Sequence, residues 1–368
     1  MSSVTIERGK IIAYRIFDVA DETDLAAAEG LIKSTHGSTR LTIERSTGRA
    51  LIVRNAPLTL TLAPAECRLG AQKITADVFA RLWDYGVISI QFHMPIPGGT
   101  SWDELVRVAA MAEDDNDFDA IALDRAQQLV GSVAGAAKSP HEPRGIEDYV
   151  VYLLEKIDGI ESPAALLTAV DVPALILGEP TEKLAQRVRN AILENSFSYS
   201  TRDLAVIDWN SALVIEPEGS RDVADILEFA VTHLMEFRYF DDLLDERLEK
   251  LYDSLERRHT LGSFFRNDYD RLSHEASSLY LEFSDYVERI ENSLKFVGDF
   301  YLATIFRSAV RRFNLREWEE SLDRKLTALA RISEVLQGEV NARRSTFLEI
   351  VVVVLILVEL LSTILRVA

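Results

Sequence analysis

The feature that most constrains this chain is a nearly unbroken apolar run at residues 348–367, LEIVVVVLILVELLSTILRV. About 20 residues at a rise of 1.5 Å each form a helix roughly 30 Å long, which matches the hydrocarbon thickness of a bilayer. We therefore expect residues 348–367 to form a C-terminal transmembrane helix that is inserted after translation as a tail anchor. The alternative is a buried core helix in a soluble oligomer, although such helices rarely stay apolar for about 20 residues.

The residues outside this run predict on which side of the membrane the body of the chain lies. Arg343 and Arg344 come just before the run, as the positive-inside tendency requires of a cytoplasmic flank. The first residues contain no apolar signal-peptide core and do not resemble an Arg-rich transit peptide. Cys67 is the one cysteine, so no intramolecular disulfide can form, which fits a reducing compartment. We expect a single-pass membrane protein with its body in the cytoplasm.

The composition leaves room for a folded body and argues against one class of partner. A chain of 368 residues with 48% hydrophobic residues has enough material for two domains besides the anchor. Its formal net charge of -19 would repel a phosphate backbone, so direct nucleic-acid binding is not expected. The acidic body is instead expected to face a protein partner.

The first 217 residues carry the mixed patterns of an α+β head domain. Apolar and polar residues alternate at Leu58–Leu62, and other short runs are rich in β-branched and aromatic residues, which indicates strands. Strands are predicted at Lys10–Phe17, Leu51–Arg54, Leu58–Leu62, Tyr85–Phe92, Asp203–Trp209 and Ser211–Glu216, and helices at Ser101–Met111, Ile121–Ala136, Ile146–Ile157 and Glu182–Glu194.

Residues 220–345 have a different pattern, which predicts a long antiparallel helical bundle similar to a coiled coil. Apolar residues recur at alternating spacings of four and three, and no proline occurs from Ser220 to Ala368. A period of 3.5 residues keeps one seam of a helix facing a partner helix. Turns are predicted at residues 260–263 and at Asn314. The seam offers more apolar surface than one hairpin needs, so we expect it to recruit further copies into a homo-oligomer.

Four segments of the second half are similar, in order, to one known family. They are ENSFSYSTRDLAVIDWNSALVIEP at 194–217, EFRYFDDLLDERL at 236–248, SLKFVGDFYLATIFRSAVRRFNLREWEESLDRKL at 293–326 and FLEIVVVVLILVELL at 347–361. Together they resemble the "required for meiotic nuclear division" (Rmd) family, mainly over residues 194–365. The resemblance implies a membrane-associated protein that forms oligomers and whose long helices end in a C-terminal hydrophobic segment.

Four polar residues interrupt the predicted anchor. Glu359 lies near its middle with Ser362 and Thr363 one turn on, and Glu349 lies at its entry, in the expected headgroup region. A carboxylate inside a bilayer costs on the order of 2.5 kcal/mol or more. Glu359 therefore either pairs with its own copies or with hydroxyls of a neighbouring helix, fixing an oligomer, or stays protonated and bonds back to its own helix.

Asp241 occupies a seam position among leucines. A polar residue at such a position can specify the register or the oligomeric state of a bundle. The alternative is an acid at a local break in the seam, paired with Arg238 or Arg247.

The densest basic cluster comprises Arg307, Arg311, Arg312 and Arg316, and is interleaved with aromatic residues. With Arg343 and Arg344, these arginines are candidate contacts for lipid phosphates or for a partner that carries RNA. The alternative is that they form ion pairs with the acids at 317, 319 and 320 around the turn.

No catalytic, cofactor-binding or metal-binding motif was found in the sequence. The six histidines lie far apart without a zinc-ligand spacing, and neither a nucleophile elbow nor a phosphate-binding loop is present. We therefore expect no enzymatic activity, no cofactor and no metal site. The predicted function is that of a membrane-tethered scaffold that homo-oligomerises. The alternatives are an oligomeric membrane pore lined by Glu359, and a membrane-anchored enzyme or ligand sensor with its site in the head domain.

Overall fold

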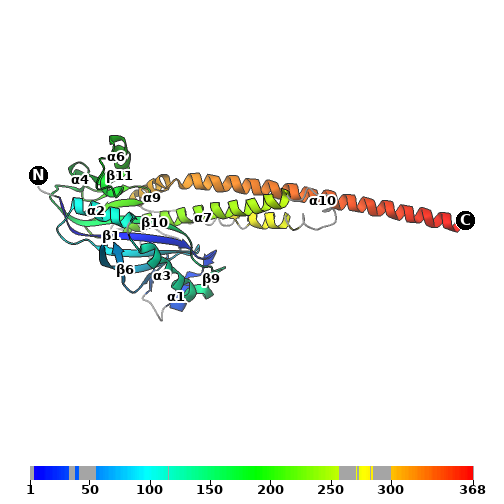
Figure 1. The fold of residues 1–368 in the computed structure, drawn as a ribbon, viewed down its shortest axis with the longest axis horizontal. Coiled ribbons are helices and arrows are strands. Elements are labelled where there is room, and N and C mark those ends of the chain that lie inside the picture. The colour runs from blue at the N-terminus through cyan, green and yellow to red at the C-terminus, as the bar shows by residue number, and fades with distance from the viewer. Residues whose placement is uncertain are drawn as a thin grey trace. The chain divides into compact units, whose positions relative to one another are not determined.

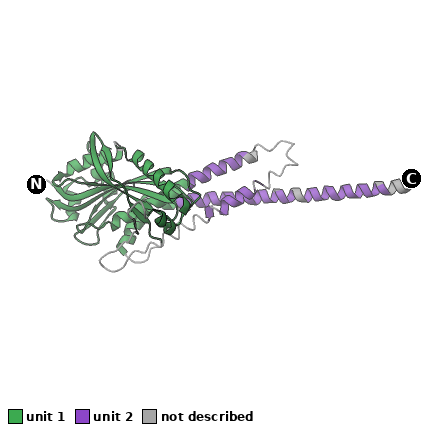
Figure 2. Cartoon of the chain, turned by 90° about the horizontal axis from the view of Figure 1, so that it is seen from below, with its two compact units in different colours: residues 1–239, 290–317 green, residues 240–289, 318–368 purple. Residues whose placement is uncertain are grey.

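The chain divides into two compact units, of which one is α+β and the other helical. The computed structural model describes residues 4–32, 38–40, 55–114, 116–256, 271, 273–281, 283–284 and 300–367. Unit 1 comprises residues 1–239 and 290–317, and unit 2 comprises residues 240–289 and 318–368 (Figure 2). Two long helices, α7 (Asp222–Glu256) and α10 (Leu315–Val367), each begin in unit 1 and continue into unit 2.

Unit 1 is built around a large mixed β-sheet (Figure 1). Its strands are β1 (Thr5–Asp18), β3 (Ser38–Arg40), β4 (Leu58–Thr61), β5 (Ala65–Leu69), β6 (Gln72–Leu82), β7 (Val87–Pro95), β8 (Thr100–Ser101), β10 (Arg144–Asp158), β11 (Ser196–Phe197), β12 (Leu204–Ile207) and β13 (Ser211–Ile215). Among the described residues they follow the order β11-β12-β13-β10-β1-β7-β6-β4-β3, with β5 added to β6 and β8 added to β1. The β10–β13 pair is parallel, and the other neighbours in this order are antiparallel.

A separate two-stranded sheet pairs β2 (Glu22–Thr23) with β9 (Ala137–Lys138). The other helices of unit 1 are α1 (Leu25–Ile32), α2 (Trp102–Asp114), α3 (Phe118–Val133), the short 3-10 helix η1 (Ala134–Ala136), α4 (Pro163–Ala169), α5 (Val172–Ile176), α6 (Gln186–Leu193) and α9 (Phe300–Arg312).

Helices cover both faces of the large sheet because successive residues of a strand point to opposite faces. On β7, Ile90 and Phe92 belong to the main apolar core, and Phe92 stacks on Phe118 of α3 with ring centroids 5.0 Å apart. The opposite face lies under α7 and α9. There Trp83 contacts Phe229 of α7, and Tyr149 contacts Phe313, the residue after α9, with ring centroids 5.4 and 5.5 Å apart.

Most of the predicted elements of the head domain are confirmed, with one clear error at Ile146–Ile157. The strands at Leu58–Leu62 and Tyr85–Phe92 correspond to β4 and β7, and the strand predicted at Leu51–Arg54 lies outside the described residues. The helix predicted at Ile146–Ile157 is instead part of β10. This strand has β1 on one side and β13 on the other, and its residues 149–154 are all buried. A strand that is buried on both faces shows no alternation of polar and apolar residues, so its sequence does not reveal its period.

Unit 2 is formed by helices whose seam leucines are buried. Leu244, Leu248 and Leu251 of α7 are at most 8% exposed, and Leu322, Leu326, Leu329 and Leu336 of α10 are similarly covered. The predicted turn at Asn314 is confirmed, because Asn314 adopts a φ of 54° between α9 and α10. The turn predicted at residues 260–263 lies outside the described residues.

The predicted transmembrane helix is wrong. Across the part of the chain that the structure describes, no helix is apolar over a length sufficient to cross a membrane. Glu349 and Glu359 bound the apolar stretch 350–358, which at 1.5 Å per residue is about 14 Å long, against about 30 Å of hydrocarbon. The prediction of a single-pass protein with a C-terminal tail anchor and a cytoplasmic body is overturned with it. The pore alternative requires the same helix.

Gly86 provides a direct test of this fold. It lies in the turn between β6 and β7 with a φ of 87°, and a Cβ added to it would stand 1.7 Å from the backbone oxygen of Ala20. Gly86→Ala should therefore lower the free energy of unfolding by about 2–4 kcal/mol. Gly131→Ala is the matched control, because Gly131 lies inside α3 with no atom within 4 Å of the added Cβ. It should raise stability by about 0.5–1 kcal/mol. Urea unfolding followed by tryptophan fluorescence measures both, and equal midpoints for the two variants would contradict the described turn.

Candidate functional site

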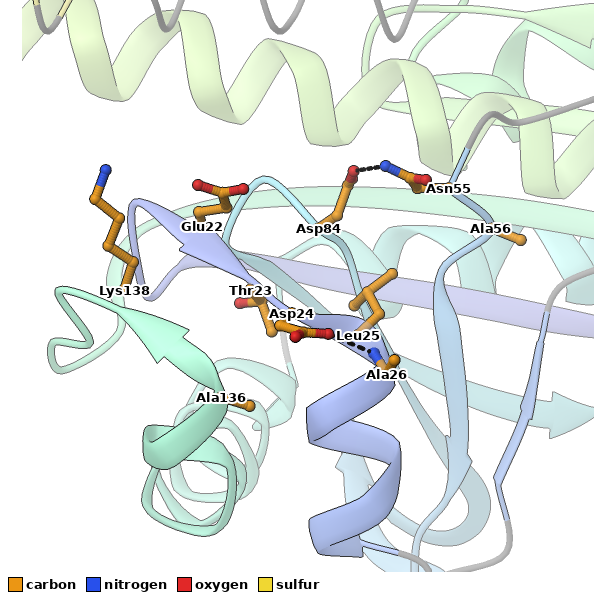
Figure 3. A pocket seen from close by; sticks show the side chains of 10 residues that line it. All are labelled: Glu22, Thr23, Asp24, Leu25, Ala26, Asn55, Ala56, Asp84, Ala136 and Lys138. Carbon is orange, nitrogen blue, oxygen red and sulfur yellow. Dashed lines mark hydrogen bonds between the residues drawn. The ribbon is translucent and has the colours of Figure 1, made fainter.

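Unit 1 contains a pocket of about 690 Å³ where β2, β9, the start of α1 and the β6–β7 turn meet (Figure 3). This volume lies within the usual range for small-molecule sites. The lining residues come from four separate segments of the chain and are Glu22, Thr23, Asp24, Leu25, Ala26, Asn55, Ala56, Asp84, Ala136 and Lys138.

Backbone hydrogen bonds fix the walls of this pocket. The β2–β9 pairing places Glu22 opposite Lys138, and their side chains point the same way in Figure 3. The Thr23 backbone N–H donates to the Asp84 carbonyl at 2.8 Å, which ties β2 to the β6–β7 turn. Asp24 begins α1, since its Oδ1 accepts hydrogen bonds from the backbone N–H groups of Ala26 and Ala27 at 2.9 and 3.0 Å.

The pocket is acidic, with three carboxylates and one ammonium group among its lining side chains. The Asn55 amide donates to Asp84 Oδ2 at 2.5 Å. Burial raises the pKa of the Asp84 carboxyl, and the nearby charge of Glu22 raises this pKa further, against the lowering effect of the Asn55 hydrogen bond. A positive group in the pocket would relieve both effects.

One polar atom at this pocket lacks a hydrogen bond. Thr23 is 2% exposed, and its hydroxyl Oγ1 has no hydrogen-bond partner. Buried hydroxyl groups in folded proteins are usually hydrogen-bonded, so such an atom calls for an explanation. Thr23 lies beside Asp24 in Figure 3.

A second group of polar side chains is buried between the sheet and α7. Arg81 of β6 forms ion pairs with Glu228 and, at 2.8 Å, with Asp225, and these three side chains are at most 7% exposed. Gln91 donates to Glu228 Oε1 at 2.8 Å and accepts from Arg221 at 3.0 Å. All of these charged groups have opposite charges beside them. The cluster therefore fastens α7 to the sheet, which is a structural role.

The other candidates for reactive groups are inactive in their environments. Burial raises the pKa of the Cys67 thiol to about 11, so the thiol remains protonated near neutral pH. Burial lowers the pKa of His93 to about 2, and the neighbouring Arg221 charge adds to this effect, so its ring is neutral. Among the described residues, no three His, Cys, Asp or Glu side chains are grouped so as to hold a metal ion.

The sheet unit coincides with a known family. A family described as the N-terminal domain of the uncharacterised protein MJ0711 matches residues 8–222, which is more than half of the chain. The chain belongs to this family. The uncharacterised protein MJ0711 from Methanocaldococcus jannaschii is 24% identical over 263 residues, which cover 69% of this chain and 77% of that protein. No solved structure matches the chain.

This membership corrects the resemblance to the Rmd family. The matching family is the MJ0711 family, and the match covers the first half of the chain, whereas the supposed Rmd resemblance was placed mainly on residues 194–365. Much of that stretch consists of long helices with heptad spacing, and such spacing recurs in unrelated proteins because the physics of helix packing imposes it. The matched range contains all the residues that line the pocket.

The predicted basic cluster is divided among several environments. Arg312 forms an ion pair with Asp208, and Arg311 donates to the Asn195 side chain at 3.3 Å. Arg307 donates to Thr304 at 3.1 Å on its own helix, and Arg316 is exposed near the start of α10. Two of the four arginines thus join α9 to segments beside β11, β12 and β13. The side chains of Arg343 and Arg344 lie outside the described residues.

Asp241 has partners that lie far from it in the sequence. Lys325 of α10 contacts Asp241 Oδ1 at 2.8 Å and Asp245 Oδ2 at 2.6 Å, and Ser321 donates to Asp241 at 2.8 Å. Arg238, one of the two predicted partners, contacts Glu147 at 2.7 Å. The charged group in the seam is therefore neutralised across two helices within unit 2.

The polar residues of the apolar run lie on the exposed surface of α10. Glu349 and Glu359 are exposed, and the Ser362 hydroxyl donates to the Glu359 carbonyl at 2.9 Å. The side chain of Thr363 lies outside the described residues. The roles predicted for these residues in an oligomer remain predictions.

The buried cluster under α7 generates a prediction about stability. Arg81→Met would leave Asp225 and Glu228 buried without their main counter-charge, and should lower the free energy of unfolding by about 3–5 kcal/mol. Arg8→Met is the matched control, because Arg8 contacts Glu155 at 2.5 Å but its side chain is 65% exposed. It should cost less than about 1 kcal/mol. Chemical unfolding of the full chain measures both, and a similar small cost for both variants would show that α7 is held mainly by its apolar contacts.

Proposed function

We propose that this protein is a non-enzymatic organising protein that self-associates through the apolar part of α10. The proposal keeps the homo-oligomeric scaffold predicted from the sequence and omits its membrane tether. It follows the alternative interpretation of the apolar run, namely a helix that is buried in the core of an oligomer. Self-association would bring several copies of unit 1, each with its pocket, into one assembly.

One observation carries this proposal. A continuous set of large apolar side chains on α10 is exposed, each by 37–62%, and comprises Phe347, Leu348, Ile350, Val351, Val352, Val353, Val354, Leu355, Ile356, Leu357, Val358 and Leu360. We call this set the apolar segment of α10. Monomeric proteins rarely expose a continuous apolar surface of this kind, and each such side chain contributes roughly 1.5–3 kcal/mol when it is fully buried.

The distribution of the apolar segment around the helix indicates what covers it. Residues 350–358 are consecutive, and successive residues of a helix are about 100° apart, so the apolar surface surrounds the helix on every side. A single partner helix covers only one stripe. Several helices are therefore needed, and further copies of the chain supply identical ones.

Charge favours contact between copies along this segment. The chain carries a formal net charge of -19, so most of its surface would repel a second copy. The stretch 350–358 carries no charged residue, and Glu349 and Glu359 lie just beyond its two ends. Copies can therefore pack along this stretch without burying a charge, while the two acids remain near water.

The proposal is tested by placing a charge in the middle of the segment. Val354 is 50% exposed, and Val354→Glu would bury one carboxylate per copy in a helical bundle. We expect the association constant of the full-length chain to fall at least about 100-fold. Light scattering after size-exclusion chromatography, in buffer without detergent, measures the change in mass.

Val335→Glu is the matched control, because Val335 is 67% exposed on the same helix but lies outside the segment. Its mass should equal that of the wild type. The proposal fails if the wild-type chain is monomeric, if Val354→Glu leaves the mass unchanged, or if the wild-type chain is recovered only with added phospholipid vesicles.

A further inference from the structure

The pocket of unit 1 has a pronounced charge preference that self-association does not use. Glu22, Asp24 and Asp84 supply three carboxylates to its lining, and Lys138 supplies the one positive charge. Acidic residues alone are common on a protein surface with this net charge. Three further features distinguish this pocket, namely its volume of about 690 Å³, its buried Thr23 hydroxyl without a hydrogen-bond partner, and its apolar walls.

We propose that this pocket binds an organic cation, namely an ammonium or guanidinium group on an alkyl chain. The charged group would lie against the carboxylates of Asp84 and Asp24, and one of its N–H groups would donate to the Thr23 hydroxyl oxygen. The alkyl chain would lie against the apolar side chains of the wall, which are Leu25, Ala26, Ala56 and Ala136.

The arrangement of the acids favours an organic cation over a metal ion. A bound metal ion needs several ligand atoms within about 2–2.6 Å of one point. In the described part of the chain, no three acidic, histidine or cysteine side chains are grouped in that way, and the three pocket carboxylates are no exception. Acids that are spread around a volume of this size are better matched by a molecule with a diffuse positive group and several N–H donors.

Electrostatics supports a positive ligand at Asp84 in particular. The Asp84 carboxylate accepts a hydrogen bond from Asn55 Nδ2 at 2.5 Å, which orients the group. Burial and the adjacent charge of Glu22 both disfavour its ionised form. A cation beside Asp84 would stabilise that form, so the bound state would gain a charge-assisted hydrogen bond in a partly desolvated site.

Two sources of such a ligand are possible, a small free amine and the lysine or arginine side chain of a protein. Both present the same chemistry to the pocket. Isothermal titration of the full-length chain should detect saturable binding of pentylamine and of pentylguanidine. It should detect none with pentan-1-ol, which has the same shape without the charge.

The tripeptide acetyl-Gly-Lys-Gly-amide separates the two sources. Tighter binding of this peptide than of pentylamine would indicate a protein side chain, and weaker binding would indicate a small amine. Both results support a cation site. Absence of saturable binding with all the cationic probes, or equal binding of pentan-1-ol, would overturn the proposal.

Two variants assign the binding to this pocket. Asp84→Asn should weaken pentylamine binding about tenfold, whereas Asp158→Asn should change it less than about twofold. Asp158 is the matched control because it is 56% exposed, belongs to the same unit and lies outside the pocket, so its replacement removes the same charge. Equal affinities of the two variants would show that net charge, and not this pocket, attracts the amine.

Thr23→Val keeps the shape of the side chain and removes the hydroxyl. It should weaken pentylamine binding about fivefold while the urea midpoint stays the same or rises, because it removes a buried polar atom without a hydrogen bond. A purely structural role for Thr23 would leave the affinity unchanged and would remove the hydroxyl from the site. Val354→Glu should bind pentylamine as the wild type does, so failure of the oligomer proposal and failure of this one are distinguishable.

Discussion

The fold of unit 1 depends on how its sheet is covered on the side that faces α7. An entirely apolar interface would bind almost any amphipathic helix, whereas here Arg81, Gln91, Asp225 and Glu228 form a connected set of buried ion pairs and hydrogen bonds. Separating α7 from the sheet would leave these charges without partners, which is costly in a poorly solvated interface. The cluster thus fixes the position of α7 along the sheet. Because α7 continues into unit 2, this contact also determines where the helical part of the chain begins.

The two proposals concern different parts of the molecule and rest on different physical effects. Self-association depends on the hydrophobic effect, acting on a helix segment that is apolar on all sides and exposed in the isolated chain. Ligand binding depends on electrostatics in a pocket where acids outnumber the single lysine. An oligomer would place several such pockets on one particle. A ligand carried on a larger partner would then bind with higher avidity than it does to one copy.

Sequence patterns predict elements well where one face is polar and the other apolar. They recovered β4 and β7 and the turn at Asn314, but not β10, because burial of its residues 149–154 removes the alternation. Long-range pairs were also missed. Arg81 and Glu228 are 147 positions apart, and Lys325 and Asp241 are too distant for any helical spacing rule to connect them. The pocket is similar in this respect, since its lining comes from segments around residues 22–26, 55–56, 84 and 136–138. The apolar run misled the analysis for another reason. The matching of its total length to a bilayer gave too little weight to Glu349 and Glu359, which bound the uninterrupted apolar stretch.

The central claim is that copies of the chain cover the apolar segment of α10, and the mass of the wild-type particle tests it most directly. One chain has a mass of 41.3 kDa. Sedimentation equilibrium in detergent-free buffer should return one discrete multiple of this mass, of three copies or more, because a single partner helix cannot surround the segment. A mass of one chain at all concentrations would contradict the account.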